Sequence, residues 1–413
     1  MRPPETASAP LVTDPELAPE PDSPAAVEKR ESQFVLGTYA RTPFHPRSGK
    51  GAKLVDADGK TYWDLLAGIA VNVLGHRHPR IVKALKDEAG KLLHVSNLFY
   101  HPAQGRLAER LVFRSGLTRA FFCNSGTEAN EAAIKFTRLA NPGRSRIVAL
   151  EESFHGRTLG SLSLTGHQSY RTPFVPLVPG ATFIPPNDIA ALEAAVAADT
   201  AAVFLEPIMG EAGVVPMAPE FMKAARAACD RTGALLVLDE IQCGLGRTGM
   251  LFAFQALGIV PDIVTLAKPL GGGLPLGAVL TGPRLEGLVK PGHHGTTFGG
   301  NPVACRLGLE MLDEIEEKQL LPRVAAMGEW LGKKLKWLMQ RAPAITEVRG
   351  RGLMWGIELD REAAPVQKKL LAKGYVVGTA RSSVLRLLPP FIVPQPALSG
   401  FVLALEASLK ENP

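Results

Sequence analysis

From Phe121 onward, short apolar runs alternate with longer segments in which apolar residues recur every three or four positions. The short runs predict strands, and the periodic segments predict helices. This alternation is typical of an α/β fold, with a mainly parallel sheet and helices on both faces. The expected strands are 120–123, 146–150, 201–205, 234–238 and 262–267, and the expected helices are 126–139, 188–197 and 218–232.

The pattern changes towards the C-terminus. Two long helical stretches are followed by short strands and two further helices, which indicates a separate α+β unit. Near the N-terminus, two short apolar runs around Asp58-Gly59 predict a hairpin. Neither piece alone buries much surface, so we expect them to pack together. The predicted division is an arm of residues 1–33, a large domain of residues 76–305, and a small domain formed by residues 34–75 and 306–413.

The predicted arm is rich in Pro, Ala and acidic residues and has almost no aromatic residues, which indicates disorder. It lacks the apolar core of a secretory signal, and its acidic residues argue against a mitochondrial presequence. No apolar stretch is long enough to span a membrane. Together with cysteines that lack CxxC spacing, these features predict a cytoplasmic protein that does not bind membranes.

The net charge of +6 is small for 413 residues, and the basic residues are scattered. This weakly favours anionic substrates and argues against nucleic acid as a partner. The histidine pairs His76/His78 and His293/His294 have no carboxylate or thiolate companions at ligand spacing, so no metal is expected.

Polar residues end two of the predicted strands. Asp239 follows the run 234–238, and Lys268 follows the run 262–267. Ligands of parallel sheets bind beyond the carboxyl ends of the strands, so both side chains should enter one crevice. A lysine there can form a Schiff base and an aspartate can hold a protonated pyridine nitrogen, as pyridoxal phosphate requires. A solvated lysine and a turn aspartate are the alternative interpretation.

The turn Ser125-Gly126-Thr127 lies between a predicted strand and a predicted helix. Free N–H groups at a helix start can bind a phosphate, Gly126 allows close approach, and the two hydroxyls can donate. An ordinary capping box of Ser125 with Glu128 would explain the same residues. The turn is not a P-loop, because the Gly-x-x-x-x-Gly-Lys pattern is absent.

Seven motifs in this order resemble the class III aminotransferases, the ornithine-type branch of fold-type I pyridoxal phosphate enzymes. The resemblance runs from about Leu36 to the C-terminus. It implies a homodimer whose active sites lie at the subunit interface. The motifs are Gly68-Ile-Ala-Val-Asn-Val-Leu-Gly-His76, Asn124-Ser-Gly-Thr-Glu-Ala-Asn130, Phe154-His-Gly-Arg157, Glu206-Pro-Ile-Met-Gly-Glu211, Asp239-Glu-Ile-Gln242, Lys268 and Thr296-Thr-Phe-Gly-Gly-Asn-Pro302.

The resemblance also implies roles for single residues at the cofactor. Lys268 would carry the Schiff base and shuttle the proton, and Asp239 would keep the pyridine nitrogen protonated. His155 would be a supporting donor near the cofactor. The remaining implied contacts are Gln242 with the ring hydroxyl, Phe154 with the ring face, Ser125, Gly126 and Thr127 with the phosphate, and Thr297 with the phosphate in the partner subunit.

For the substrates, the resemblance implies that Arg157 clamps the distal carboxylate and Arg386 the α-carboxylate of glutamate. Glu211 would neutralise Arg386 while the other amino donor is bound. Tyr39 and Thr296 are further expected substrate contacts.

The amino donor is expected to be N-acetylornithine, with 2-oxoglutarate as acceptor. The basis is the similarity of Tyr39-Ala40-Arg41, Ile69 and Leu74-Gly75-His76 to the branch that uses this donor. Ile69 stands where ornithine-specific members tend to have a tyrosine. Met209, where glutamine is common, leaves the preference open. Ornithine, succinylornithine and a carrier-linked lysine precursor are alternative donors; an aminomutase of the glutamate-semialdehyde type and a non-catalytic cofactor-binding protein are alternative functions.

Overall fold

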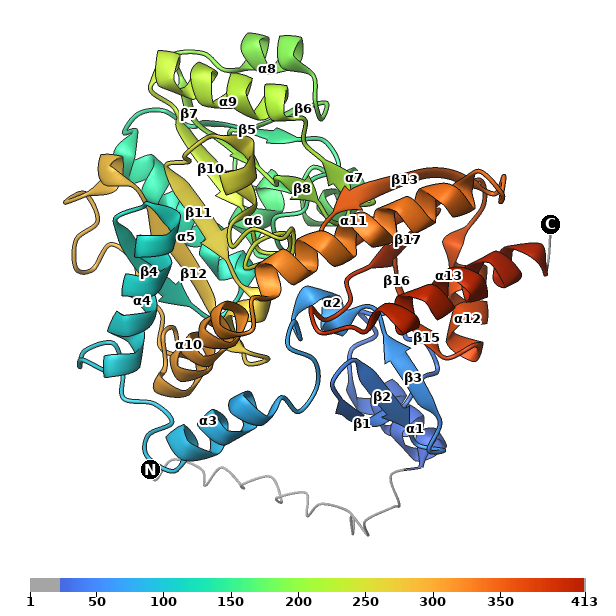
Figure 1. Ribbon diagram of the computed structural model, residues 1–413. Coiled ribbons are helices and arrows are strands. Elements are labelled where there is room, and N and C mark those ends of the chain that lie inside the picture. The colour runs from blue at the N-terminus through green and yellow to red at the C-terminus, as the bar shows by residue number, and fades with distance from the viewer. Residues whose placement is uncertain (1–22, 412–413) are drawn as a thin grey trace, which may run out of the picture.

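The computed structural model describes residues 23–411 and is built around a seven-stranded sheet (Figure 1). Within this sheet, each pair of neighbouring strands is parallel except the two pairs that β12 forms, with β11 and with β4, which are antiparallel. This confirms the predicted α/β fold with a mainly parallel sheet. In spatial order the strands are β4 (Arg119–Cys123), β12 (Gly277–Thr281), β11 (Ile263–Leu266), β10 (Leu235–Asp239), β7 (Thr200–Leu205), β5 (Arg146–Leu150) and β6 (Ala181–Ile184).

Helices cover both faces of this sheet (Figure 1). On one face, Phe221 and Ala225 of α9 (Pro219–Thr232) share a core cluster with Leu236 of β10. On the other, α5 (Gly126–Ala140) shares a core cluster with Val237, the next residue of β10. Every position of β7 and β10 is buried, because apolar residues on both strand faces meet a helix layer.

The two chain ends meet in the smaller sheets. The predicted N-terminal hairpin forms β1 (Pro46–Lys50), β2 (Lys53–Asp56) and β3 (Thr61–Asp64), and β3 pairs in parallel with β15 (Tyr375–Val376). A second sheet has the order β13 (Ile345–Arg351), β14 (Met354–Leu359), β17 (Val384–Leu387) and β16 (Gly378–Ala380). The β3–β15 pairing joins the two ends of the chain, which supports a small domain built from both. We propose the domain boundaries that the sequence predicted.

The remaining elements connect these layers. The helices are α2 (Ala67–Ala70), α3 (Pro79–Ala89), α4 (Pro102–Ser115), α6 (Leu159–Leu164), α7 (Gln168–Arg171), α8 (Ile189–Ala195), α10 (Pro302–Glu317), α11 (Leu320–Met339), α12 (Ala363–Ala372) and α13 (Gln395–Lys410). A short pair, β8 (Ile208–Met209) and β9 (Val215–Pro216), encloses the turn that carries Glu211. No helix within residues 23–411 is long and apolar enough to cross a membrane.

One prediction for the N-terminal arm was wrong. Pro24–Phe34 form helix α1, whereas the arm was expected to be disordered through residue 33; residues 1–22 lie outside the described part. The Ser23 side chain caps α1 by accepting from the Ala26 N–H at 3.2 Å. The Ala, Glu, Lys and Arg residues that follow favour a helix. The overall composition of the arm did not indicate this helix.

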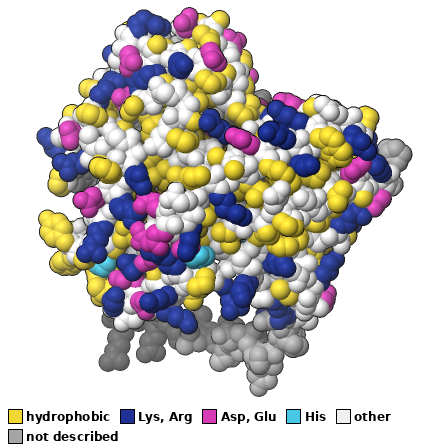
Figure 2. Space-filling model, viewed as in Figure 1, with side chains coloured by type: hydrophobic (Ala, Val, Ile, Leu, Met, Phe, Trp, Pro, Cys, Tyr) yellow, Lys and Arg dark blue, Asp and Glu magenta, His cyan; other side chains and the backbone are white. Residues whose placement is uncertain are grey.

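The surface agrees with the scattered charges of the sequence. On the face shown in Figure 2, Lys and Arg side chains are interspersed with Asp and Glu rather than gathered in one basic patch.

Candidate active site

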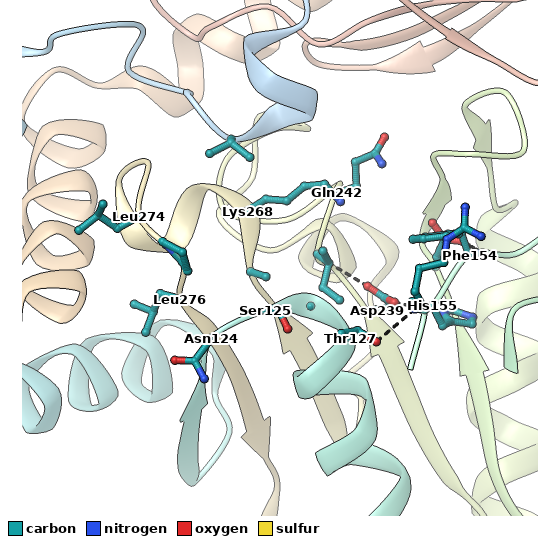
Figure 3. A pocket seen from close by; sticks show the side chains of 18 of the residues that line it. Asn124, Ser125, Thr127, Phe154, His155, Asp239, Gln242, Lys268, Leu274 and Leu276 are labelled. Carbon is teal, nitrogen blue, oxygen red and sulfur yellow. Dashed lines mark hydrogen bonds and ion pairs between the residues drawn. The ribbon is translucent and has the colours of Figure 1, made fainter. Parts of the chain in front are cut away.

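A cavity of about 430 Å³ lies at the carboxyl ends of β10 and β11, as expected for a parallel sheet (Figure 3). It is lined by the turn before α5, the loop after β5, and the segments that follow β10 and β11. The cavity brings together the predicted substrate residue Arg157 and most of the predicted cofactor site: Ser125, Gly126, Thr127, Phe154, Asp239, Gln242 and Lys268.

Lys268 follows β11 after one residue, Ala267, and enters the cavity (Figure 3). Its backbone has a φ of +46°, an unfavourable conformation for a residue with a side chain. Such strain is typical of functional sites. Burial lowers the pKa of Lys268, although Asp239 and Glu211 act in the opposite direction. A lysine with a depressed pKa has more of the unprotonated amine that acts as a nucleophile.

Asp239 is the last residue of β10 and is only 4% exposed. Its Oδ2 atom accepts from Asn130 Nδ2 at 2.8 Å and lies 2.8 Å from His155 Nδ1; its Oδ1 accepts from the Ile241 N–H at 3.0 Å. A carboxylate accepts only, so His155 Nδ1 carries the proton. The expected supporting position of His155 is therefore present. Asn130 was not singled out from the sequence, although an asparagine among the alanines of the apolar face of α5 was a usable signal.

The predicted phosphate turn is also a helix cap. Ser125 Oγ accepts from the Glu128 N–H at 3.3 Å, while the Glu128 carboxylate accepts from the Asn124 N–H at 2.5 Å. A Cβ at Gly126 would stand 2.8 Å from the end of the Ile241 side chain, which would have to shift to admit any larger residue. No acceptor in the described part of the chain takes the N–H groups of Gly126 and Thr127. These two donors at the start of α5 fit an anionic group such as a phosphate.

Arg157 lies at the rim of the cavity, where its guanidinium carbon is 4.0 Å from the centre of the Tyr170 ring. It also lies 5.5 Å from the Phe154 ring, which meets Tyr170 edge-on. Stacking on an aromatic ring orients a guanidinium group while its N–H donors stay available. Tyr170 had not been recognised, because nothing in its local sequence indicates this contact.

Arg386, on β17, is 3% exposed and forms an ion pair with Glu211. Its Nη1 atom also donates to Gln242 Oε1 at 3.3 Å and to the Gly210 carbonyl at 3.4 Å. Burial alone would raise the pKa of Glu211, but the charge and hydrogen bond of Arg386 outweigh it and lower the pKa. The predicted pairing of Glu211 with Arg386 is therefore present beside the cavity.

Three predicted residues lie apart from this cavity. Tyr39 is 78% exposed and lines a surface groove along α1. Thr297 is exposed, next to Phe298, which is 61% exposed. Thr296 lies closer, since its Oγ1 accepts from Asn124 Nδ2 at 2.9 Å. One chain therefore does not bring Tyr39 or Thr297 to Lys268, and their roles stay predictions.

Comparison with known proteins decides the family. The family model for aminotransferase class-III matches residues 37–409. The chain belongs to the class-III aminotransferases. This confirms the resemblance inferred from the motifs, and with it pyridoxal phosphate as the cofactor of the family. The free N–H groups at the start of α5, the strand-end lysine and the fixed carboxylate of this aminotransferase fit that cofactor.

The aminotransferase is similar along nearly its whole length to curated relatives. It is 45% identical to the acetylornithine aminotransferase of Methanocaldococcus jannaschii, over 92% of this chain and 97% of that protein. It is 49% identical to the acetylornithine aminotransferase of Mycobacterium tuberculosis (strain ATCC 25618 / H37Rv), over 93% of this chain and 96% of that protein.

Solved structures share the fold. The ornithine aminotransferase from Toxoplasma gondii ME49 matches with a TM-score of 0.91 and 32% identity, covering 95% of this chain and 96% of that chain. The acetylornithine aminotransferase from Elizabethkingia anophelis matches with a TM-score of 0.86 and 32% identity, covering 95% and 100%. An ornithine aminotransferase and an acetylornithine aminotransferase thus both share this fold, so the fold alone does not decide the amino donor.

Proposed function

We propose that this aminotransferase transfers the ω-amino group of N-acetylornithine to 2-oxoglutarate, giving N-acetylglutamate semialdehyde and glutamate. The Glu211–Arg386 pair beside the Lys268 cavity carries the proposal, together with the names of the relatives at 45–49% identity. A donor with one carboxylate far from its amine leaves Arg386 without a ligand, and Glu211 then neutralises it. Glutamate brings a second carboxylate, which can replace Glu211.

Pyridoxal phosphate, when bound, supplies an electron sink for the carbon that bears the amino group. Asp239, fixed by Asn130 and His155, would hold the proton on the pyridine nitrogen. Lys268 Nζ would take the proton from the substrate carbon that bears the amino group and deliver it to C4′ of the cofactor. The N–H groups of Gly126 and Thr127 would hold the phosphate, Phe154 would cover the ring and Gln242 would contact the ring hydroxyl.

Substrate carboxylates would be held by two arginines in different surroundings, Arg157 exposed and Arg386 buried. Arg157 stacks on Tyr170 at the cavity rim and would bind the distal carboxylate of either substrate. Arg386 would bind the α-carboxylate of glutamate after Glu211 moves away. An unpaired buried arginine is unfavourable, so the Glu211 pair keeps the site stable in the other half-reaction.

A homodimer would complete the site. Leu98 is 86% exposed and Phe99 68% exposed, and such apolar surface is typical of a subunit interface. In that assembly Thr297 would reach the phosphate of the partner subunit, and Tyr39 and Thr296 would contact substrate. The cytoplasmic location also stays a prediction; one relative, from Alnus glutinosa, is named as mitochondrial.

The test is a donor panel with purified protein, pyridoxal phosphate and 2-oxoglutarate, in which glutamate formation is measured. We expect kcat/KM to be highest with N-acetylornithine, because Ile69 offers no partner for the second ammonium of ornithine. Equal kcat/KM with ornithine or succinylornithine would favour those alternatives. Turnover of glutamate semialdehyde without 2-oxoglutarate would favour the aminomutase. Borohydride should attach the cofactor to the peptide that contains Lys268, and attachment elsewhere would contradict the assignment.

A further inference from the structure

Glu206 is a buried carboxylate for which the transamination chemistry above has no use. It follows β7, is 5% exposed and lines the same cavity as Lys268. Its Oε1 atom accepts from the Phe154 N–H at 2.9 Å, and its Oε2 atom accepts from the Gly210 N–H at 3.1 Å. Burial raises the pKa of Glu206 to about 7, even though these two donors and His155 favour its charged form. A carboxylate kept in such a place despite this penalty calls for a structural or functional reason.

The two N–H groups belong to two different loops. One loop carries Arg157, and the other carries Glu211, the partner of Arg386. Phe154 begins the loop that leads to Arg157. Gly210 precedes Glu211, and the Gly210 carbonyl itself accepts from Arg386 at 3.4 Å. A Cβ at Gly210 would stand 2.3 Å from the Gln242 side chain, so the Gly210 peptide packs tightly on the group that also contacts Arg386.

We propose that Glu206 is a positioning residue: its two oxygens fix the Phe154–Arg157 loop and the Gly210–Glu211 peptide to each other. It thereby sets the position from which Glu211 closes on Arg386. The inference rests on the proposed function, because it gives Glu206 its effect through the Glu211–Arg386 switch.

The chemistry of the carboxylate suggests the substitution. Both oxygens of Glu206 accept, whereas Glu206→Gln keeps the size but presents an NH₂ group to one of the two N–H donors. One loop is then released. A looser Gly210 peptide holds Glu211 less firmly on Arg386, so Arg386 becomes more available to an α-carboxylate. The rate constant of the half-reaction with glutamate should therefore rise relative to that with the preferred ω-amino donor. Glu211→Ala should have the same effect.

The experiment measures single-turnover rate constants of both half-reactions in the holoenzyme, for the parent, Glu206→Gln, Glu211→Ala and the double variant. We expect Glu206→Gln to raise the glutamate-to-donor ratio of rate constants about fivefold, and by less than about twofold when Glu211 is already alanine. A residue with a merely structural role would change both backgrounds equally. Glu206→Asp, which keeps the charge but is too short to reach both loops, should shift the ratio in the same direction and serves if Glu206→Gln does not fold.

Glu240→Gln is the matched control. Glu240 is also buried and also accepts two backbone N–H groups, from Ala253 and Phe254 at 2.7 Å each, but it does not line the cavity. It should leave the ratio unchanged even if the protein is less stable. An unchanged ratio in both Glu206 variants, or an equal change with and without Glu211, would overturn the role of Glu206. If Glu211→Ala itself leaves the ratio unchanged, the switch in the proposed function fails, and this inference with it.

Discussion

Two carboxylates of the active site, Asp239 and Glu211, are held in opposite ways. Asp239 is bonded to Asn130, to His155 and to the backbone of Ile241, and is 4% exposed. The Glu211 side chain is 27% exposed, and its contacts are all on one side, with Arg386 and Gln242. Asp239 cannot turn without breaking three hydrogen bonds to three different residues, whereas Glu211 can swing outward by giving up the ion pair with Arg386 and one hydrogen bond from Gln242.

The difference follows from where each residue lies in the fold. Asp239 ends a central strand with a helix layer on each face. Glu211 lies in the turn between the two-residue strands β8 and β9. The part of the site that serves every step is thus built on the rigid sheet, and the part that must differ between two substrates is built on a turn. If this is right, changes on the Asp239 side should affect both half-reactions equally, and changes on the Glu211 side should affect one.

The largest effect is expected from Asp239→Asn. A neutral amide cannot stabilise the protonated pyridine nitrogen, so both half-reactions should slow by about 100-fold or more while the cofactor still binds. Single-turnover kinetics would measure the rates, and the absorbance of the bound cofactor would confirm occupancy. Asp262→Asn is the control, because Asp262 is a buried carboxylate before β11, away from the cavity. Activity of Asp239→Asn within about threefold of the parent would refute the role.

Arg386→Ala should slow mainly one half-reaction, whereas Asp239→Asn should slow both. The half-reaction with glutamate should slow by about 100-fold, since a buried charged hydrogen-bonding partner for the α-carboxylate is lost. The half-reaction with the ω-amino donor should change by less than about threefold. Arg157→Ala, tested in parallel, should slow both. Equal losses in both half-reactions of Arg386→Ala would remove the distinction between the two regions.

The sequence could predict the rigid region from physics. Apolar runs identify β10 and β11 as buried strands, and the rule for parallel sheets then places Asp239 and Lys268 at one edge. It could not predict the φ of Lys268 or the bond from Asn130, which is 109 positions away from Asp239. It also missed β12, and a short apolar run does not reveal whether a strand runs parallel or antiparallel.

The adjustable region was accessible only through the family resemblance. Glu211 and Arg386 are 175 positions apart, and neither has a local pattern that requires the other. Tyr170, which supports Arg157, has no such motif either. Thr297 was predicted to act in the partner subunit, and Tyr39 to contact substrate, and neither lies at the Lys268 cavity of its own chain.

A smaller effect is expected from Asn130→Ala. It removes one of the bonds to Asp239 and leaves the others, so both half-reactions should slow by about three- to tenfold. Their ratio should stay the same. Single-turnover rates measured as above would check this, and a change in only one half-reaction would contradict the assignment of Asn130 to the rigid region.

The smallest effect concerns stability and pH, and it contrasts Glu211 with Glu240. The pKa of Glu211 is lowered in the folded protein, so its ion pair stabilises the fold above the ordinary value of 4.5 and is lost as the pH falls through the folded value. The parent should therefore melt a few degrees above Glu211→Gln at pH 7, and this gap should narrow below pH 4.5.

Glu240 should give the opposite slope in the same experiment. Burial raises its pKa from 4.5 to about 7, so its ionisation penalises the folded state as the pH rises through this window. The advantage of the parent over Glu240→Gln should thus be greatest near pH 4.5 and decline towards pH 8. Thermal unfolding of the three proteins across this range measures both gaps. Parallel slopes for the two variants would mean that the Arg386 pair does not hold Glu211 in its charged form.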